Sequence, residues 1–183
     1  MPPKSTSQII NAFWKATNEI PSAYLYAILD CARNESIYPK LIGSDEEYRC
    51  LYKGKLPAEM AAVAQYLVRF HSGSKFLEYM VEKGWGDNWG IFFSSSTYLG
   101  PLESHFREFI LASTEEGNVF YFRFYDPRVF RVYLPTCNPS ELNRFFGPVA
   151  VYLIEDETPD SISRFTLRSG MLHRDNLWVG NGS

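Results

Sequence analysis

Serine, histidine and aspartate residues in this sequence could together carry out hydrolysis. In serine hydrolases a serine hydroxyl lies beside a histidine that a carboxylate orients, and Ser95, His105 and Asp126 could form such a set. If the strands before them are parallel, Asp30, the serines at 94–96 and Asp126 all lie at carboxyl ends of strands, where open α/β sheets bind ligands. No GxSxG turn marks a nucleophile. The triad is therefore the weaker hypothesis, and His105 is expected to be a structural residue at the edge of an apolar helix stripe.

The segment FYFRFYDPRVF, residues 120–130, combines aromatic and charged residues and contains the junction Asp126-Pro127. An aspartate before a helix accepts hydrogen bonds from the first backbone N–H groups. Proline suits the first helical position, where a donor would have no partner. A change from strand to helix therefore accounts for Asp126 and Pro127 without any chemistry.

Arg123 is harder to explain, because it stands in the middle of this aromatic run. Strand alternation would place Phe120, Phe122 and Phe124 on the core face and Arg123 on the other, between two tyrosines. If that face is covered, Arg123 must pair with Asp30 or Asp126, since an unpaired buried charge is costly. If it is open, it is a surface of the kind that binds partners. The candidate partner-binding residues are Arg107, Tyr121, Arg123, Tyr125 and Arg128.

Other motifs argue against cofactors. The sequence has no glycine-rich dinucleotide or phosphate loop and no HExxH. His71, His105 and His173 show no metal-ligand spacing with each other or with the three cysteines. We expect neither a metal nor a cofactor.

Composition limits the partners and the compartment. The net charge is −3 and no Lys/Arg tract is present, so nucleic acid is not an expected partner. No apolar run approaches the roughly 20 residues that span a bilayer. Three cysteines without CxxC spacing and the lack of a signal sequence favour a reduced, cytoplasmic protein.

Strand and helix patterns alternate along the chain. Buried strands are expected at 23–30, 65–70, 89–96, 119–126 and 149–156, with capped helices beginning after Ser74 and Asn138. This alternation predicts a single α/β layered domain with a mixed, partly parallel sheet flanked by helices. An α+β arrangement is the alternative, because residues 31–64 have no clear pattern. The expected divisions are an N-terminal helix (1–20), the core (21–156) and a C-terminal extension (157–183), in which 161–169 is an edge strand or a docked segment.

Seven blocks occur in an order that resembles a known family. They are YAILDCAR, LYKG, QYLVRF, WGIFFSSS, LESHFREFI, FYFRFYDPRVF and FFGPV, within residues 24–149. The chain is similar to the type VI secretion adaptor chaperones, with FRFYDPRV and the helix bearing His105 and Arg107 as the most specific pieces. Gln65, just ahead of Tyr66, stands where the family often has proline, and longer members have a larger C-terminal lobe. The family's motif residues correspond to Asp30, His105, Arg107, Arg123, Tyr125, Asp126 and Arg128.

The resemblance implies a non-enzymatic cytoplasmic chaperone. Such a protein binds a toxic protein effector and assists its loading onto the spike protein of the secretion system. Two other hypotheses remain from the residues: a small α/β hydrolase-like enzyme that uses the strand-end carboxylates and serines, and a structural subunit of a larger complex.

Overall fold

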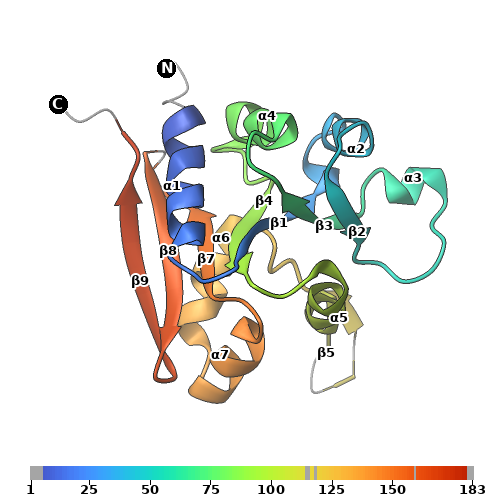
Figure 1. Cartoon of the computed structure of the whole chain (residues 1–183). Helices are drawn as coiled ribbons and strands as arrows, with labels where there is room; N and C mark the ends of the chain where they lie inside the picture. Colours follow the sequence, from blue (N-terminus) through green and yellow to red (C-terminus); the bar gives the residue numbers. More distant parts are fainter. Residues whose placement is uncertain (1–5, 114–115, 118, 159, 181–183) are drawn as a thin grey trace.

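A single twisted sheet forms the centre of the molecule (Figure 1). The computed structural model describes residues 6–113, 116–117, 119–158 and 160–180. Within them the sheet has seven strands in the order β2-β3-β1-β4-β7-β8-β9. The strands are β1 (Tyr24–Asp30), β2 (Glu47–Cys50), β3 (Gln65–Phe70), β4 (Gly90–Ser95), β7 (Val151–Glu155), β8 (Ser161–Arg168) and β9 (Met171–Trp178).

Every neighbouring pair in this sheet is antiparallel, so the prediction of a partly parallel sheet is wrong and the α+β alternative describes the fold. Parallel strands were expected because strands and helices alternate along the chain, and the strands are also almost continuously apolar, a pattern typical of parallel strands buried on both faces. Here an antiparallel sheet is also covered on both faces, which produces the same pattern in its central strands.

Helices cover the two faces of the sheet separately (Figure 1). One face packs against α1 (Thr6–Asn18), α2 (Ile37–Ile42) and α4 (Lys75–Gly84), and the other against α5 (Leu99–Ile110), α6 (Pro127–Tyr133) and α7 (Pro139–Phe146). Short helical turns occur at α3 (Ala58–Ala61), η1 (Cys31–Arg33) and η2 (Leu134–Thr136). Strand β1 contributes to both cores, because Leu25 and Ala27 belong to the first and Tyr26 and Ile28 to the second.

Local helix signals are confirmed. Ser74 Oγ accepts a hydrogen bond from the Leu77 N–H at 2.9 Å and begins α4. Asn138 and Glu141 form a reciprocal capping box at the start of α7, with distances of 2.7 and 2.9 Å. These signals succeed because donor and acceptor lie within one turn of each other.

The predicted strand at 119–126 is wrong over most of its length. Only Val119–Tyr121 forms a strand, β6, and it pairs with β5 (Leu111–Ser113) in a hairpin separate from the main sheet. The chain then bends, and the Asp126 N–H donates to the Arg123 carbonyl at 3.0 Å. Phe124 and Tyr125 are both buried, which strand alternation would not allow on a half-covered sheet. The side chain of Phe120 lies outside the described part of the structure.

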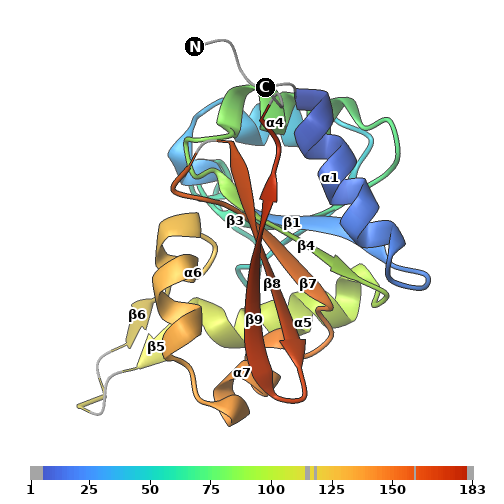
Figure 2. The same cartoon turned by 90° about the vertical axis from the view of Figure 1, so that its left-hand side faces the viewer.

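The C-terminal residues take part in the sheet. Residues 161–168 form β8, which pairs with β7 on one side and β9 on the other, so this segment is an interior strand and β9 is the edge. Figure 2 shows the long β8–β9 hairpin at this edge of the sheet.

Candidate partner-binding surface

Asp30 and Arg123 form an ion pair that joins the end of β1 to the bend after β6. The Arg123 Nη2 atom lies 2.7 Å from Asp30 Oδ2. Asp30 is buried, and its Oδ1 accepts hydrogen bonds from Gln65 Nε2 at 3.1 Å and from the Ala32 N–H at 3.2 Å. Arg123 is 46% exposed on its side chain. Arg123 therefore has the carboxylate partner that a structural role requires, and that partner is Asp30.

Asp126 is the N-cap of α6, as predicted, and Pro127 occupies the first turn. The Asp126 carboxylate accepts the Arg128 N–H at 3.0 Å and binds the Arg128 guanidinium through both oxygens, at 3.0 and 2.7 Å. Burial opposes ionisation of Asp126, but the hydrogen bonds from Arg128 outweigh it and lower the carboxyl pKa. Arg128 itself is largely exposed, so its outer side faces solvent.

Tyr121, Arg123 and Tyr125 differ in exposure. Tyr121 is exposed, whereas Tyr125 is buried. Burial, together with the charge of Asp30, raises the pKa of the Tyr125 hydroxyl well above its usual range. The expected strip is therefore exposed at Tyr121 and Arg123 and buried at Tyr125, whose hydroxyl lies beside the Arg123 guanidinium.

Arg107, on α5, holds the chain that follows β2. Its guanidinium donates to the carbonyl oxygens of Cys50, Leu51 and Tyr52 at 3.0 to 3.1 Å. Its Nη2 also lies 2.6 Å from Glu103 Oε1. A planar guanidinium with several donors suits this role, because it fixes three successive carbonyl groups from one position.

Beside Arg107 lies an apolar depression that we call the hairpin groove. Its volume is ≈ 360 Å³, and it lies between the segment after β2, the turn α3, the end of α5 and the β5–β6 hairpin. Met60, Leu111 and Tyr121 are 50%, 55% and 57% exposed, which is high for large apolar side chains gathered in one place. The Tyr52 and Tyr121 rings pack edge to face at 5.6 Å. The groove is lined by Leu51, Tyr52, Lys53, Leu56, Met60, Arg107, Ile110, Leu111 and Tyr121.

Sequence reasoning identified two of these groove residues, Arg107 and Tyr121. It missed Tyr52, Met60 and Leu111, which lie in the patternless region 31–64 or at the end of a helix stripe. The only signal for this part of the groove in the sequence was the block LYKG, which contains Leu51 and Tyr52.

The three residues of the candidate triad are all described by the structure, and no hydrogen bond joins any two of them. The Ser95 hydroxyl donates to the Pro148 carbonyl at 2.6 Å and accepts the Thr97 N–H. His105 Nε2 lies 3.0 Å from the Phe145 carbonyl oxygen, and burial lowers its pKa. Ser95 pairs in register with Tyr24 at the start of β1, whereas Asp30 ends that strand, because antiparallel neighbours place their carboxyl ends at opposite edges.

The structure thus defines a layered α+β domain whose apolar groove lies beside the segment 120–130. A family model matches residues 25–144, and the chain belongs to that family, described as a domain of unknown function (DUF4123). The family is associated with type VI secretion effector adaptors. No curated protein and no solved structure gives a match. Among the described helices, none has the length and apolar character needed to cross a bilayer.

Proposed function

We propose that this protein is a cytoplasmic adaptor chaperone that binds a type VI secretion effector in the hairpin groove and assists its loading onto the spike protein. The observation that carries the proposal is the exposure of Met60, Leu111 and Tyr121 around one groove. Its family's association with effector adaptors supports a protein as the partner.

The lining of the groove suits a protein segment. Tyrosine, methionine and arginine are enriched in protein interfaces, where they offer large contact area together with hydrogen-bonding or adaptable ends. Lys53 adds positive charge to the lining, whereas the charge of Arg107 is paired with Glu103. We therefore propose that the groove accepts an amphipathic segment of the effector, with apolar anchors on one side and an acidic residue at the rim.

Co-purification with a candidate effector encoded beside this protein's gene tests the proposal. Tyr121→Ala and Met60→Ala should each weaken the complex by more than about 1 kcal/mol, as expected at an interface hot spot. Val132→Ala is the matched control, because Val132 is 72% exposed on α6, away from the groove lining. Thermal unfolding should show that all three variants fold. Full binding by the Tyr121→Ala/Met60→Ala double variant would reject the groove as the effector site.

The same proposal holds that the protein is not an enzyme. The purified protein should show no turnover of ester or peptide substrates. Turnover that is lost in Ser95→Ala would instead support the hydrolase hypothesis.

A further inference from the structure

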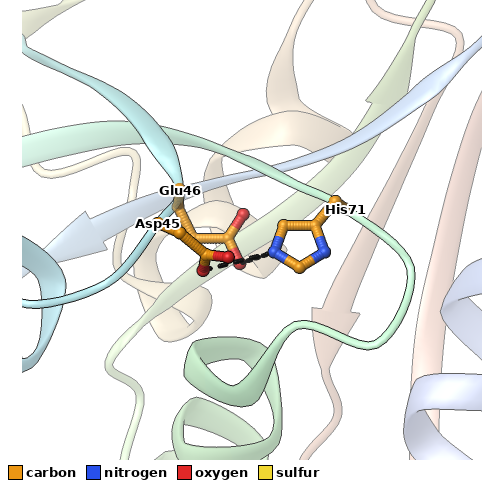
Figure 3. A group of neighbouring side chains, drawn as sticks. All are labelled: Asp45, Glu46 and His71. Carbon is orange, nitrogen blue, oxygen red and sulfur yellow. Dashed lines mark ion pairs between the residues drawn. The ribbon is translucent and has the colours of Figure 1, made fainter.

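Asp45, Glu46 and His71 converge at the edge of the sheet (Figure 3). Asp45 and Glu46 immediately precede β2, and His71 immediately follows β3. The two strands are antiparallel, with Glu47 opposite Arg69, so the residues before β2 and after β3 meet at one end of the pair. One ligand atom from each of the three side chains lies within 4.8 Å of the others.

Glu46 is an unusual carboxylate in this cluster. Its side chain is 1% exposed, and among the described residues no close hydrogen bond reaches either carboxylate oxygen, although the Ser74 hydroxyl and the His71 backbone N–H lie nearby. A buried carboxylate is costly unless it is paired or binds a metal, and the charged or ligating group beside it here is the His71 imidazole. The Glu46 carboxylate points towards the His71 imidazole (Figure 3).

His71 is oriented as metal-binding histidines are. Its Nδ1 lies 3.0 Å from the Ser72 carbonyl oxygen and must be the protonated nitrogen to donate to it. This leaves Nε2 facing the two carboxylates, where its lone pair is available to a cation when the ring is neutral. A backbone carbonyl that fixes the tautomer through the second ring nitrogen is the usual outer partner of a metal-bound histidine.

The distances within the cluster fit a shared cation, and they also lie within the range of ion pairs to a protonated His71. His71 Nε2 is 3.3 Å from Asp45 Oδ1 and 3.4 Å from Glu46 Oε1. Strong N–H···O hydrogen bonds between charged groups are shorter, at about 2.7–2.9 Å. In a tetrahedral zinc site with bonds of about 2.1 Å, neighbouring ligand atoms lie about 3.4 Å apart.

We propose that Asp45, Glu46 and His71 bind a divalent transition-metal ion, with Zn²⁺ as the best fit. Two carboxylates and a neutral imidazole carry the charge of −2 that such an ion neutralises, and the nearest arginine on β3, Arg69, is already paired with Glu47. An imidazole in the set favours zinc over magnesium or calcium, which prefer oxygen ligands alone. Asp45 is 81% exposed, so the fourth position is open to water. The ion would fasten the beginning of edge strand β2 to the end of β3.

Zinc binding to the chelator-treated full chain, followed by calorimetry and thermal unfolding, tests this site. We expect one equivalent of Zn²⁺ to bind and to raise the unfolding midpoint, and Mg²⁺ at the same concentration to have no effect. His71→Ala and Glu46→Gln should each weaken Zn²⁺ binding by at least about tenfold. His173→Ala is the matched control, because it removes a histidine from β9, at the opposite edge of the sheet, and should leave Zn²⁺ binding unchanged.

Amide chemical shifts provide a readout that does not depend on the stability of the variants. Zn²⁺ should shift resonances of residues 44–47 and 70–73 in the unmodified chain. The proposal is overturned if Zn²⁺ gives no midpoint change and no shifts in these segments, or if His71→Ala folds and still binds Zn²⁺ with full affinity.

Discussion

Asp30 shows how one side chain can join three parts of this fold. Asp30 is the last residue of β1, and its carboxylate caps η1 by accepting the Ala32 N–H. The same carboxylate accepts hydrogen bonds from Gln65 on β3 and from Arg123 in the bend after β6. Asp30 and Arg123 are 93 positions apart in sequence, so only the folded chain brings them together.

Arg123→Ala is expected to lower the free energy of unfolding by about 2 kcal/mol. Removing one partner of a buried ion pair strands the other and costs roughly 3–5 kcal/mol. The loss should be smaller here, because the Arg123 side chain is 46% exposed and solvent screens the pair. Urea unfolding measures it, and Arg144→Ala is the control, since that arginine pairs with Glu108 at 3.5 Å with both side chains mostly exposed. Equal stability of the two variants would mean that Arg123 does not serve the fold.

Glu155 is expected to make stability depend on pH. Its carboxylate is buried at the end of β7 and accepts the backbone N–H groups of Gly86 and Asn88 at 3.0 and 3.2 Å. Burial raises the pKa of Glu155 from 4.5 to about 7, against the lowering effect of these hydrogen bonds and of Arg131. Between these two pKa values the folded chain retains a proton that the unfolded chain has released, so stability falls as pH rises.

Glu155→Gln should remove this pH dependence. A glutamine carbonyl can still accept both N–H groups but cannot ionise. The variant should therefore gain stability over the unmodified chain as pH rises from 5 to 8, by up to about 3 kcal/mol, taking 1.36 kcal/mol for each pKa unit. Urea unfolding at several pH values measures the gain. A difference between the two proteins that stays constant from pH 5 to pH 8 would contradict the raised pKa.

At the scale of elements, the start of α6 depends on Asp126. Asp126→Ala removes both the cap and the partner of the Arg128 guanidinium, and should cost about 1 kcal/mol or slightly more. Asp126→Asn is the comparison, because the amide oxygen can still cap while the charge is lost, and it should cost less. Thermal unfolding distinguishes the two variants, and an unchanged midpoint in Asp126→Ala would show that the cap contributes nothing.

Elements formed by contacts between residues close in sequence could be predicted, and elements formed by contacts between distant residues could not. The caps at Ser74, Asp126 and Asn138 depend on atoms within one turn and were predicted correctly. The prediction of a strand at 119–126 was wrong because it rested on the high strand propensity of an aromatic run. The path of the backbone there depends instead on the burial of Phe124 and Tyr125 among residues distant in sequence.

At the scale of the whole molecule, strand direction could not be predicted from apolar pattern. Helices on both faces bury the central strands whichever way they run, so the sequence pattern is the same for parallel and antiparallel neighbours. The candidate sites show the same limit. The hairpin groove combines α5 with a region that has no motif, and His71 meets Asp45 and Glu46 only because β2 and β3 pair.

The C-terminal hairpin completes the sheet that the family-matched region begins. The match ends at residue 144, before β7, yet β4 pairs directly with β7 and β7 with β8. On β8, Ile162 and Phe165 are fully buried, one in each of the two cores. A chain that ends at Asp156 would lose both side chains and leave β7 as an unprotected edge, which favours aggregation.

We therefore expect the chain truncated after Asp156 to give no cooperative unfolding transition and to be largely insoluble. A milder change tests the same idea without deleting a strand: Phe165→Ala should cost about 3–5 kcal/mol, because the ring packs against Phe130 inside the second core. Met171→Ala is the control in the same hairpin, since Met171 is 61% exposed and should change stability by less than about 0.5 kcal/mol. Urea unfolding compares the point variants, and gel filtration with circular dichroism examines the truncated chain. A soluble, monomeric and cooperatively folding truncated chain would show that residues 157–183 are an appendage to an independent core.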